Sequence, residues 1–203
     1  MPARRLHRPR KAAGRRSPRR APDATRPAGR PAPAGPEFRI GCGVDLHPLR
    51  LGRRLVLGGV SIPHDRGLEG HSDADVVAHA VCDAIFGALG LSDLGTRFPD
   101  TAAENRGRSS LDFLREAGQQ ARRLGWDIVN VDAVVLAESP RLAPHLQAMR
   151  EATAAALDCP TGRVGVRAKH AEGLGSIGRG EGMIAQAVAL LVRAAGRRPG
   201  GGR

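Results

Sequence analysis

An acidic and an imidazole side chain stand two positions apart inside an apolar run, Gly-Val-Asp-Leu-His-Pro-Leu, at residues 43–49. Side chains of a strand alternate between its two faces, so Asp45 and His47 are expected to project from the same face. This pair has two interpretations: a strand end with two solvated polar groups, or half of a metal site. Pro48 follows directly, and we expect it to end the strand.

Two further histidines, His71 and His79, lie at the start of the next apolar segment. Three protein ligands leave a fourth zinc position open, which is typical of catalytic zinc sites. If both histidines were helical, a rise of about 12 Å would separate them, too far to bind one ion. We therefore expect them to have different roles. His79 has Asp75 and Asp83 four residues away on either side, where a carboxylate could orient its ring; alternatively, His79 is an ordinary core or surface histidine and Asp75 caps a helix.

The elements that must position these residues follow from the periodicity of apolar side chains. We expect strands at residues 38–47, 54–62 (interrupted at Gly58-Gly59), 128–137 and 163–169. We expect helices at residues 72–90, 110–125 and 144–157. Ser72 and Asp75 form the pattern of a capping box, and Gly90 suits a helix end. Residues 91–100 are predicted as a loop, and residues 183–194 fit either a helix or a strand, so the chain is predicted to be an α+β or α/β domain.

The basic charge of the chain belongs to its ends. The formal net charge is +12 over 203 residues, yet residues 1–36 alone carry eleven basic side chains and one acidic one. Residues 37–192 carry 17 basic and 19 acidic side chains. Segments rich in Arg, Pro and Ala with few large apolar residues cannot offset their ordering entropy. We therefore predict one domain at 37–195, with disordered extensions at 1–36 and 196–203.

Cysteine usage and hydropathy indicate the cellular compartment in which the chain is expected. The three cysteines are widely spaced and form no CxxC pair, so we expect free thiols in a reducing cytoplasm. Cys42 is expected to face away from Asp45 as a small core residue. No run approaches 18 apolar residues, which argues against a membrane span. Residues 1–36 lack the apolar centre of a secretory signal.

Four motifs occur together and in order: DLH at 45–47, HSDADVVAH at 71–79, FPDT at 98–101 and GRGEG at 178–182. With the segments between them, they resemble the 2-C-methyl-D-erythritol 2,4-cyclodiphosphate synthase family of the non-mevalonate isoprenoid pathway, from about Arg39 to Arg193. The resemblance implies an α+β, ferredoxin-like domain with a mixed or antiparallel sheet and helices on one face. It also implies a homotrimer with active sites between neighbouring subunits.

The activity that the resemblance implies is a lyase reaction. The 2-phosphate of 4-diphosphocytidyl-2-C-methyl-D-erythritol 2-phosphate attacks the β-phosphorus, and CMP and a cyclic diphosphate are formed. By motif, the zinc ligands fall on Asp45, His47 and His79, and Glu172 falls on the ligand of a second divalent ion, Mg²⁺ or Mn²⁺. The candidate catalytic residues are His71 and His170. The implied substrate-binding residues are Asp45, His47, His71, Ser72, Asp93, Leu94, Gly95, Phe98, Pro99, Asp100, Ala137, Pro140, Arg141, Leu142, Ala143, Lys169, His170, Glu172, Ser176 and Arg179.

The chain departs from the family pattern at several positions around the implied nucleotide site. Lys169 and His170 replace threonines, one of which normally contacts the bridging phosphates. Ser176 stands where an aromatic residue is expected, and Ala102 where an acidic residue is often seen. We expect Lys169 or His170 to donate to phosphate instead, more strongly if charged.

Two other classes of function remain open. In a zinc hydrolase of phosphate esters, Asp45, His47 and His79 would activate water instead. A nucleic-acid-binding protein would use the basic residues 1–36, a role that we do not favour. The resemblance also suggests a partner, the upstream cytidylyltransferase, because synthases of this family are fused to it or work beside it in many bacteria.

Overall fold

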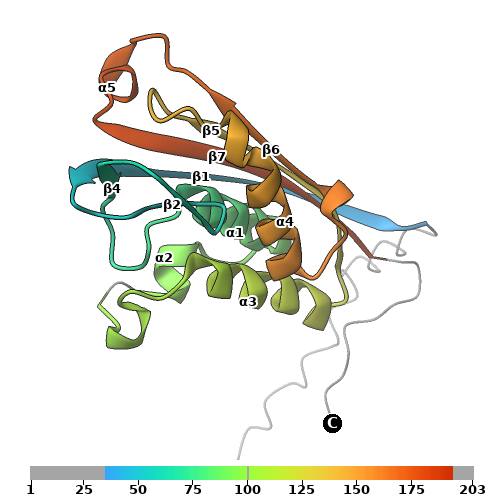
Figure 1. Cartoon of the computed structure of the whole chain (residues 1–203). Helices are drawn as coiled ribbons and strands as arrows, with labels where there is room; N and C mark the ends of the chain where they lie inside the picture. The colour runs from blue at the N-terminus through green and yellow to red at the C-terminus, as the bar shows by residue number, and fades with distance from the viewer. Residues whose placement is uncertain (1–34, 100, 194–203) are drawn as a thin grey trace, which may run out of the picture. The chain divides into compact units, whose positions relative to one another are not determined.

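A computed structural model describes residues 35–99 and 101–193 of the chain. A curved sheet lies against three longer helices, α1, α3 and α4 (Figure 1). The predicted extensions at 1–36 and 196–203 lie outside the described residues, except for Gly35 and Pro36, which precede the first strand. Within the described ranges, no helix has the length and apolar character needed to cross a membrane.

The main sheet has five strands in the order β4-β1-β7-β5-β6. Its strands are β1 (Glu37–Leu51), β4 (Arg66–Leu68), β5 (Asp127–Leu136), β6 (Val164–Lys169) and β7 (Gly182–Arg193). The β5–β6 pair is parallel and the other pairs are antiparallel, so the expected mixed sheet is confirmed. Strands β2 (Leu55–Leu57) and β3 (Val60–Ile62) form a separate hairpin around Gly58-Gly59. The ferredoxin-like topology stays a prediction.

The first and last strands run side by side along most of their length. The segment that fitted either a helix or a strand is β7, and it pairs with β1 from Glu37↔Arg193 to Pro48↔Gly182. The expectation that Pro48 ends the first strand is wrong. At Pro48 the strand changes partner, because Leu49–Leu51 pair with β4 beyond it. A residue without an N–H group is tolerated at such a transition.

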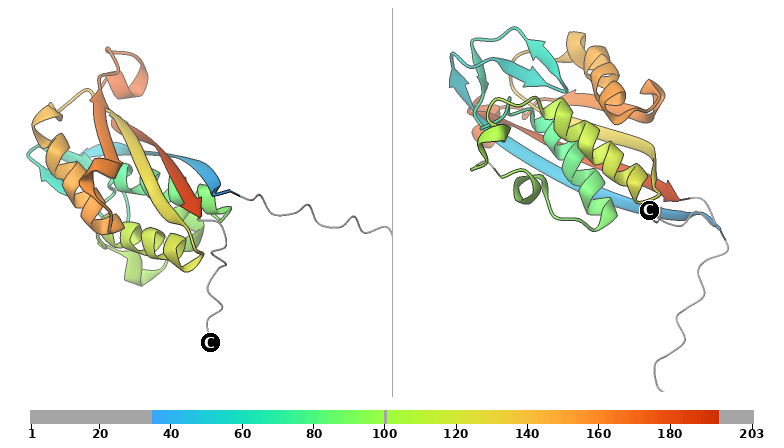
Figure 2. Two further views of the ribbon diagram at one scale, coloured as in Figure 1. Left: turned by 90° about the vertical axis from the view of Figure 1, so that its right-hand side faces the viewer. Right: turned by 90° about the horizontal axis from the view of Figure 1, so that it is seen from below.

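The helices cover one face of the sheet, as the two views in Figure 2 show. Helix α1 packs on β1 and β7, α4 packs on β6, and α3 packs against α1 and α4. The helices are α1 (Val76–Leu89), α2 (Leu94–Arg97), α3 (Ser110–Arg123), α4 (Leu146–Leu157) and α5 (Gly175–Gly178). Three 3₁₀ turns lie at Ala103–Asn105, Ala143–His145 and Thr161–Arg163.

Two helix starts and one additional helical turn differ from the sequence-based expectation. Helix α1 begins at Val76 and not after Ser72, because Asp75 is its N-cap and accepts hydrogen bonds from Val77 N and Ala78 N. The predicted loop at 91–100 contains the single helical turn α2, capped by Asp93. Helix α4 begins at Leu146, because Pro144 lies in the preceding 3₁₀ turn.

Two glycines allow α1 to lie directly on the backbone of β1. A Cβ atom at Gly41 would lie 1.9 Å from Ala84 O, and one at Gly43 would lie 2.1 Å from Ala80 O. Real Cβ atoms do not approach so closely, so any side chain at either position would push the helix away. This contact brings the second turn of α1 next to the strand segment that follows Gly43.

The opposite face of the sheet is apolar and exposed in the single chain. Phe38, Ile40 and Leu46 on β1 are 57%, 71% and 63% exposed, and Val188 on β7 is 41% exposed. Cys42 lies on this face and is also exposed, so it points away from Asp45 as expected. The expectation that Cys42 is a core residue is wrong, because none of the helices in residues 35–99 and 101–193 covers this side of β1.

Candidate active site

Asp45, His47 and His79 meet on the helix-covered side of the sheet. His79 Nδ1 lies 2.9 Å from Asp45 Oδ2, and His47 Nε2 lies 3.2 Å from the same oxygen. One ligand atom from each residue lies within 4.8 Å of the others. Two imidazoles and a carboxylate form a donor set that suits Zn²⁺ and leaves a coordination position open for a further ligand. Of the two interpretations of the Asp-x-His pair, the geometry favours the metal site.

Asp45 and His47 shift each other's pKa in opposite directions. Burial would raise the pKa of Asp45, but the hydrogen bonds and charges of His47 and His79 outweigh it and hold that pKa well below its usual value. Burial would lower the pKa of His47, but the hydrogen bond and charge of Asp45 raise it overall. Asp45 is therefore ionised at neutral pH and favours a positive charge beside it, either on a ring or on a bound cation.

The residues that hold His79 are not the ones expected from the sequence. Asp75 bonds Gly58 N and Gly59 N at 2.8 and 2.6 Å, in addition to capping α1, and Asp83 accepts from Leu94 N at 2.7 Å. The alternative role of Asp75 as a helix cap is thus confirmed. Among the described residues, neither carboxylate forms a hydrogen bond with the His79 ring; the contact of Asp75 with His79 is the backbone bond from His79 N to Asp75 O, at 3.0 Å.

A cavity of about 400 Å³ opens beside the three residues. Burial raises the pKa of Asp83 on its wall, and the negative charges of Asp93 and Asp45 act in the same direction. The cavity is lined by Asp45, His47, Gly70, His71, Ser72, His79, Asp83, Leu94, Gly95, Phe98, Asn105 and Phe113. Seven residues expected to contact the substrate, together with the expected metal ligand His79, are therefore brought together here.

A second, smaller cavity of about 150 Å³ gathers seven of the residues that the resemblance assigns to substrate binding. It lies between the β5–α4 connection and the end of β6, and three basic side chains take part in its wall. It is lined by Ala137, Pro140, Arg141, Leu142, Ala143, Leu146, Ala168, Lys169 and His170. The two cavities share no lining residue, so one chain holds two separate parts of the expected site.

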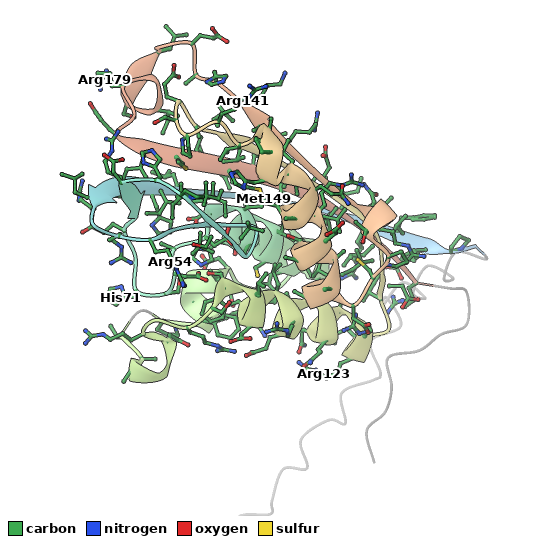
Figure 3. All side chains as sticks on the ribbon, viewed as in Figure 1. Arg54, His71, Arg123, Arg141, Met149 and Arg179 are labelled. Atoms are coloured by element: carbon green, nitrogen blue, oxygen red, sulfur yellow. The ribbon has the colours of Figure 1, made fainter. Side chains whose placement is uncertain are left out.

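The remaining expected residues that the structure describes line neither cavity. Glu172 is exposed at φ 52°, Ser176 lies in α5, and Arg179 pairs with Glu181 at 2.6 Å. Asp93 caps α2, Pro99 accepts from Asn105 Nδ2, and Asp100 lies outside the described residues. Figure 3 shows Arg141 and Arg179 well apart from His71. Among the described residues, Glu172 belongs to no group of three potential metal ligands.

Several site residues were missed by sequence reasoning. Ser110 Oγ lies 2.8 Å from His79 Nε2, and Ser110 also bonds Asp73. Asn105 and Phe113 complete the wall of the large cavity. Asp73 lies within the HSDAD motif, but Ser110 is 31 residues from His79 and belongs to another helix. No local spacing signals such a contact.

Comparisons with known proteins identify the family of the chain. The profile of the YgbB family matches residues 38–192. A 2-C-methyl-D-erythritol 2,4-cyclodiphosphate synthase from Paraburkholderia phymatum is 54% identical over 157 residues, which are 77% of this chain and 99% of the relative. A solved structure of such a synthase in its CDP-bound form has a TM-score of 0.70 and 38% identity, covering 75% of this chain and 99% of the other.

A longer protein is also similar. The bifunctional IspDF from Campylobacter jejuni has a TM-score of 0.75 and 39% identity, covering 79% of this chain and 43% of that chain. The chain therefore belongs to the YgbB family of enzymes, and its curated relatives are lyases of non-mevalonate isoprenoid synthesis named 2-C-methyl-D-erythritol 2,4-cyclodiphosphate synthase.

Proposed function

We propose that this chain converts 4-diphosphocytidyl-2-C-methyl-D-erythritol 2-phosphate to 2-C-methyl-D-erythritol 2,4-cyclodiphosphate and CMP. The observation that carries the proposal is the convergence of Asp45, His47 and His79 beside a cavity in a chain of this family. The reaction is an intramolecular phosphoryl transfer, in which positioning and charge neutralisation matter more than a nucleophile from the protein.

The proposed metal at Asp45, His47 and His79 is Zn²⁺, which fits two neutral imidazole nitrogens and a carboxylate. When bound, it supplies positive charge that polarises a phosphate oxygen and offsets the charge of the transferring group. Glu172 is proposed to bind Mg²⁺ or Mn²⁺, which prefer carboxylate and water ligands. Its exposed position leaves room for water and phosphate oxygens to complete that shell.

The residues around the large cavity are proposed to hold the methylerythritol part. His71 and Ser72 line it on the β4–α1 side, and Leu94 and Gly95 line it from α2. Asp83 accepts from Leu94 N and so ties the first turn of α2 to α1. Phe98 lies 4.7 Å from Phe113, ring centre to ring centre, and provides an apolar wall that excludes water from one side.

The small cavity is proposed to receive the cytidine part, with Lys169, His170 and Arg141 placed to neutralise the diphosphate. The CDP in the bound form of the similar synthase supports a nucleotide ligand of this kind. His170 is exposed directly after β6, so its ring nitrogens are available to a ligand. We propose that it donates to the diphosphate in place of a threonine.

A homotrimer is proposed because one chain holds only separated parts of the site. The exposed apolar face of β1 and β7 supports association, because such a face on a sheet is unfavourable in water. A neighbouring subunit could then place its small cavity against the large cavity of this chain. A working partnership with the cytidylyltransferase that makes the substrate precursor is a further proposal, motivated by the longer bifunctional relative.

Zinc-dependent product formation tests the proposed function. We expect the purified protein to bind about one zinc ion per chain and to release CMP from the substrate. His79→Ala should lose both properties, because it removes one of three ligands. Release of inorganic phosphate in place of CMP would support the zinc hydrolase instead, and full zinc occupancy in His79→Ala would show that the ion binds elsewhere.

A further inference from the structure

A buried chain of hydrogen bonds leads from His79 away from the proposed metal. His79 Nε2 lies 2.8 Å from Ser110 Oγ, and the same hydroxyl donates to Asp73 Oδ1. Ser110 N also donates to both oxygens of Asp73, at 3.1 Å each. Ser72 Oγ is a second, longer neighbour of Nε2 at 3.3 Å, and it accepts from Ala74 N. Ser110 is fully buried, so water does not compete for these contacts.

The proton positions follow from the chemistry of these groups. A serine hydroxyl has one proton to donate, and an ionised carboxylate can only accept. Because Ser110 donates to Asp73, its oxygen can only accept at His79. His79 Nε2 must therefore carry a proton, which leaves Nδ1 as a lone pair in the neutral ring.

That lone pair points at an oxygen that also accepts. His79 Nδ1 lies 2.9 Å from Asp45 Oδ2. His47 Nε2 lies 3.2 Å from the same oxygen, while the ring of His47 bonds the backbone of Glu69. Acceptor atoms at such distances repel each other unless a ring proton or a metal cation lies between them. The hydrogen-bond pattern thus agrees with the proposed metal site without reference to any relative.

We propose that Asp73 and Ser110 are positioning residues that fix His79 in the Nε2–H tautomer and so present Nδ1 to the metal. This inference rests on the metal site of the proposed function and deepens it. Partners of this kind raise the basicity of a ligating histidine and hold its ring orientation, and their loss typically weakens metal binding 10–100-fold.

A purely structural role for the pair makes a different prediction. Asp73 joins the loop before α1 to the first residue of α3. If the pair has a structural role alone, removing Asp73 would lower the stability of the fold without changing the tautomer of His79. Asp73→Asn separates the two roles, because it keeps the shape but adds an amide donor. That amide can donate to Ser110 Oγ, which frees the Ser110 proton for His79 Nε2 and favours a proton on Nδ1, the nitrogen that should bind the metal.

The test is a zinc titration of the full-length, chelator-stripped protein against a competing chromophoric chelator. Asp73→Asn and Ser110→Ala should each bind zinc about 10–100-fold more weakly than the wild type, with thermal melts showing that they are folded. Ser109→Ala is the matched control, because Ser109 is exposed at the same helix end and its side chain makes no capping bond. We expect its zinc affinity to equal that of the wild type.

Ring-nitrogen NMR of His79 in the wild type tests the tautomer independently. The proton should lie on Nε2 in the zinc-loaded protein, with Nδ1 unprotonated. A proton on Nδ1 would overturn the inference, as would wild-type zinc affinity in both variants. A wild type that binds no zinc would instead refute the metal site of the proposed function, an outcome distinct from a zinc-binding wild type with unaffected variants.

Discussion

Replacing Gly43 by alanine should separate the metal ligands without touching any of them. Gly43 lies two residues before Asp45 on β1 and packs against the α1 backbone at Ala80, the residue after His79. The helix can approach the strand this closely only because Gly43 has no side chain. The ligand geometry therefore depends on a backbone contact that the substitution removes.

The size of the displacement follows from the contact distances. A Cβ atom at Gly43 would lie 2.1 Å from Ala80 O, whereas ordinary contact begins at 3.4 Å. The helix must move by about 1 Å, and His79 Nδ1, now 2.9 Å from Asp45 Oδ2, would move with it. Metal–ligand distances tolerate only about 0.2 Å. We expect zinc affinity to fall by about 100-fold or more, and overpacking to cost about 1–3 kcal/mol of unfolding free energy.

The assay measures the zinc dissociation constant and the urea midpoint of Gly43→Ala beside those of Gly87→Ala. Gly87 lies in α1 at the same helix–strand interface, but a Cβ atom there would be 3.7 Å from Cys42 O, an ordinary contact. Alanine is a better helix former than glycine by up to about 1 kcal/mol. Gly87→Ala should therefore keep wild-type zinc affinity and gain a little stability.

Wild-type zinc affinity in a folded Gly43→Ala protein would refute this reasoning. It would mean that the strand and helix can separate while the three ligands stay in place. Equal losses of zinc affinity in Gly43→Ala and Gly87→Ala would also contradict it, because only the first substitution meets a steric conflict.

Three further predictions concern stability, pH and the nucleotide cavity. Asp75→Ala should lower the unfolding free energy by about 2–4 kcal/mol in urea melts, because α1 loses its cap and Gly58 N and Gly59 N lose their acceptor. Zinc affinity should fall on acidification, by about tenfold per pH unit once His47 protonates. Burial lowers the pKa of His47, but Asp45 raises it overall. The loss should therefore begin at a higher pH than for an ordinary histidine, in titrations from about pH 8 to about pH 5.5. His170→Ala should slow CMP release about tenfold, which is less than the effect of losing a sole transition-state donor. An unchanged turnover number and pH profile would show that the side chain has no catalytic part.

Most of the correct predictions about the fold came from the spacing of apolar residues within a single segment. The periodicity of α1, α3 and α4 and the apolar runs of β5 and β6 placed these elements near their observed bounds. The start of α1 was misplaced because Ser72 and Asp75 both suit a cap, and only the contacts of Asp75 with Gly58 and Gly59 decide between them. The continuation of β1 through Pro48 depends on β4, which no local signal announces.

In the candidate site, too, local patterns were predicted correctly and contacts between distant elements were missed. Asp45 and His47 were recognised because they share one strand face, and His79 because it ends a motif. Ser110 was missed because its role arises where α3 meets α1, a contact between elements far apart in sequence. The separation of the two cavities also could not be read from the motifs, since order along the chain does not reveal which residues share a wall.

The most direct test of the proposed activity follows the phosphorus atoms and the solvent oxygen together. The protein, Zn²⁺ and Mg²⁺ are incubated with 4-diphosphocytidyl-2-C-methyl-D-erythritol 2-phosphate in ¹⁸O-labelled water, and the products are examined by ³¹P NMR. Attack by the substrate's own 2-phosphate predicts CMP and cyclic diphosphate in equal amounts, with no ¹⁸O in either. Labelled inorganic phosphate, labelled CMP or an open-chain diphosphate would show that water is the nucleophile and would contradict intramolecular transfer.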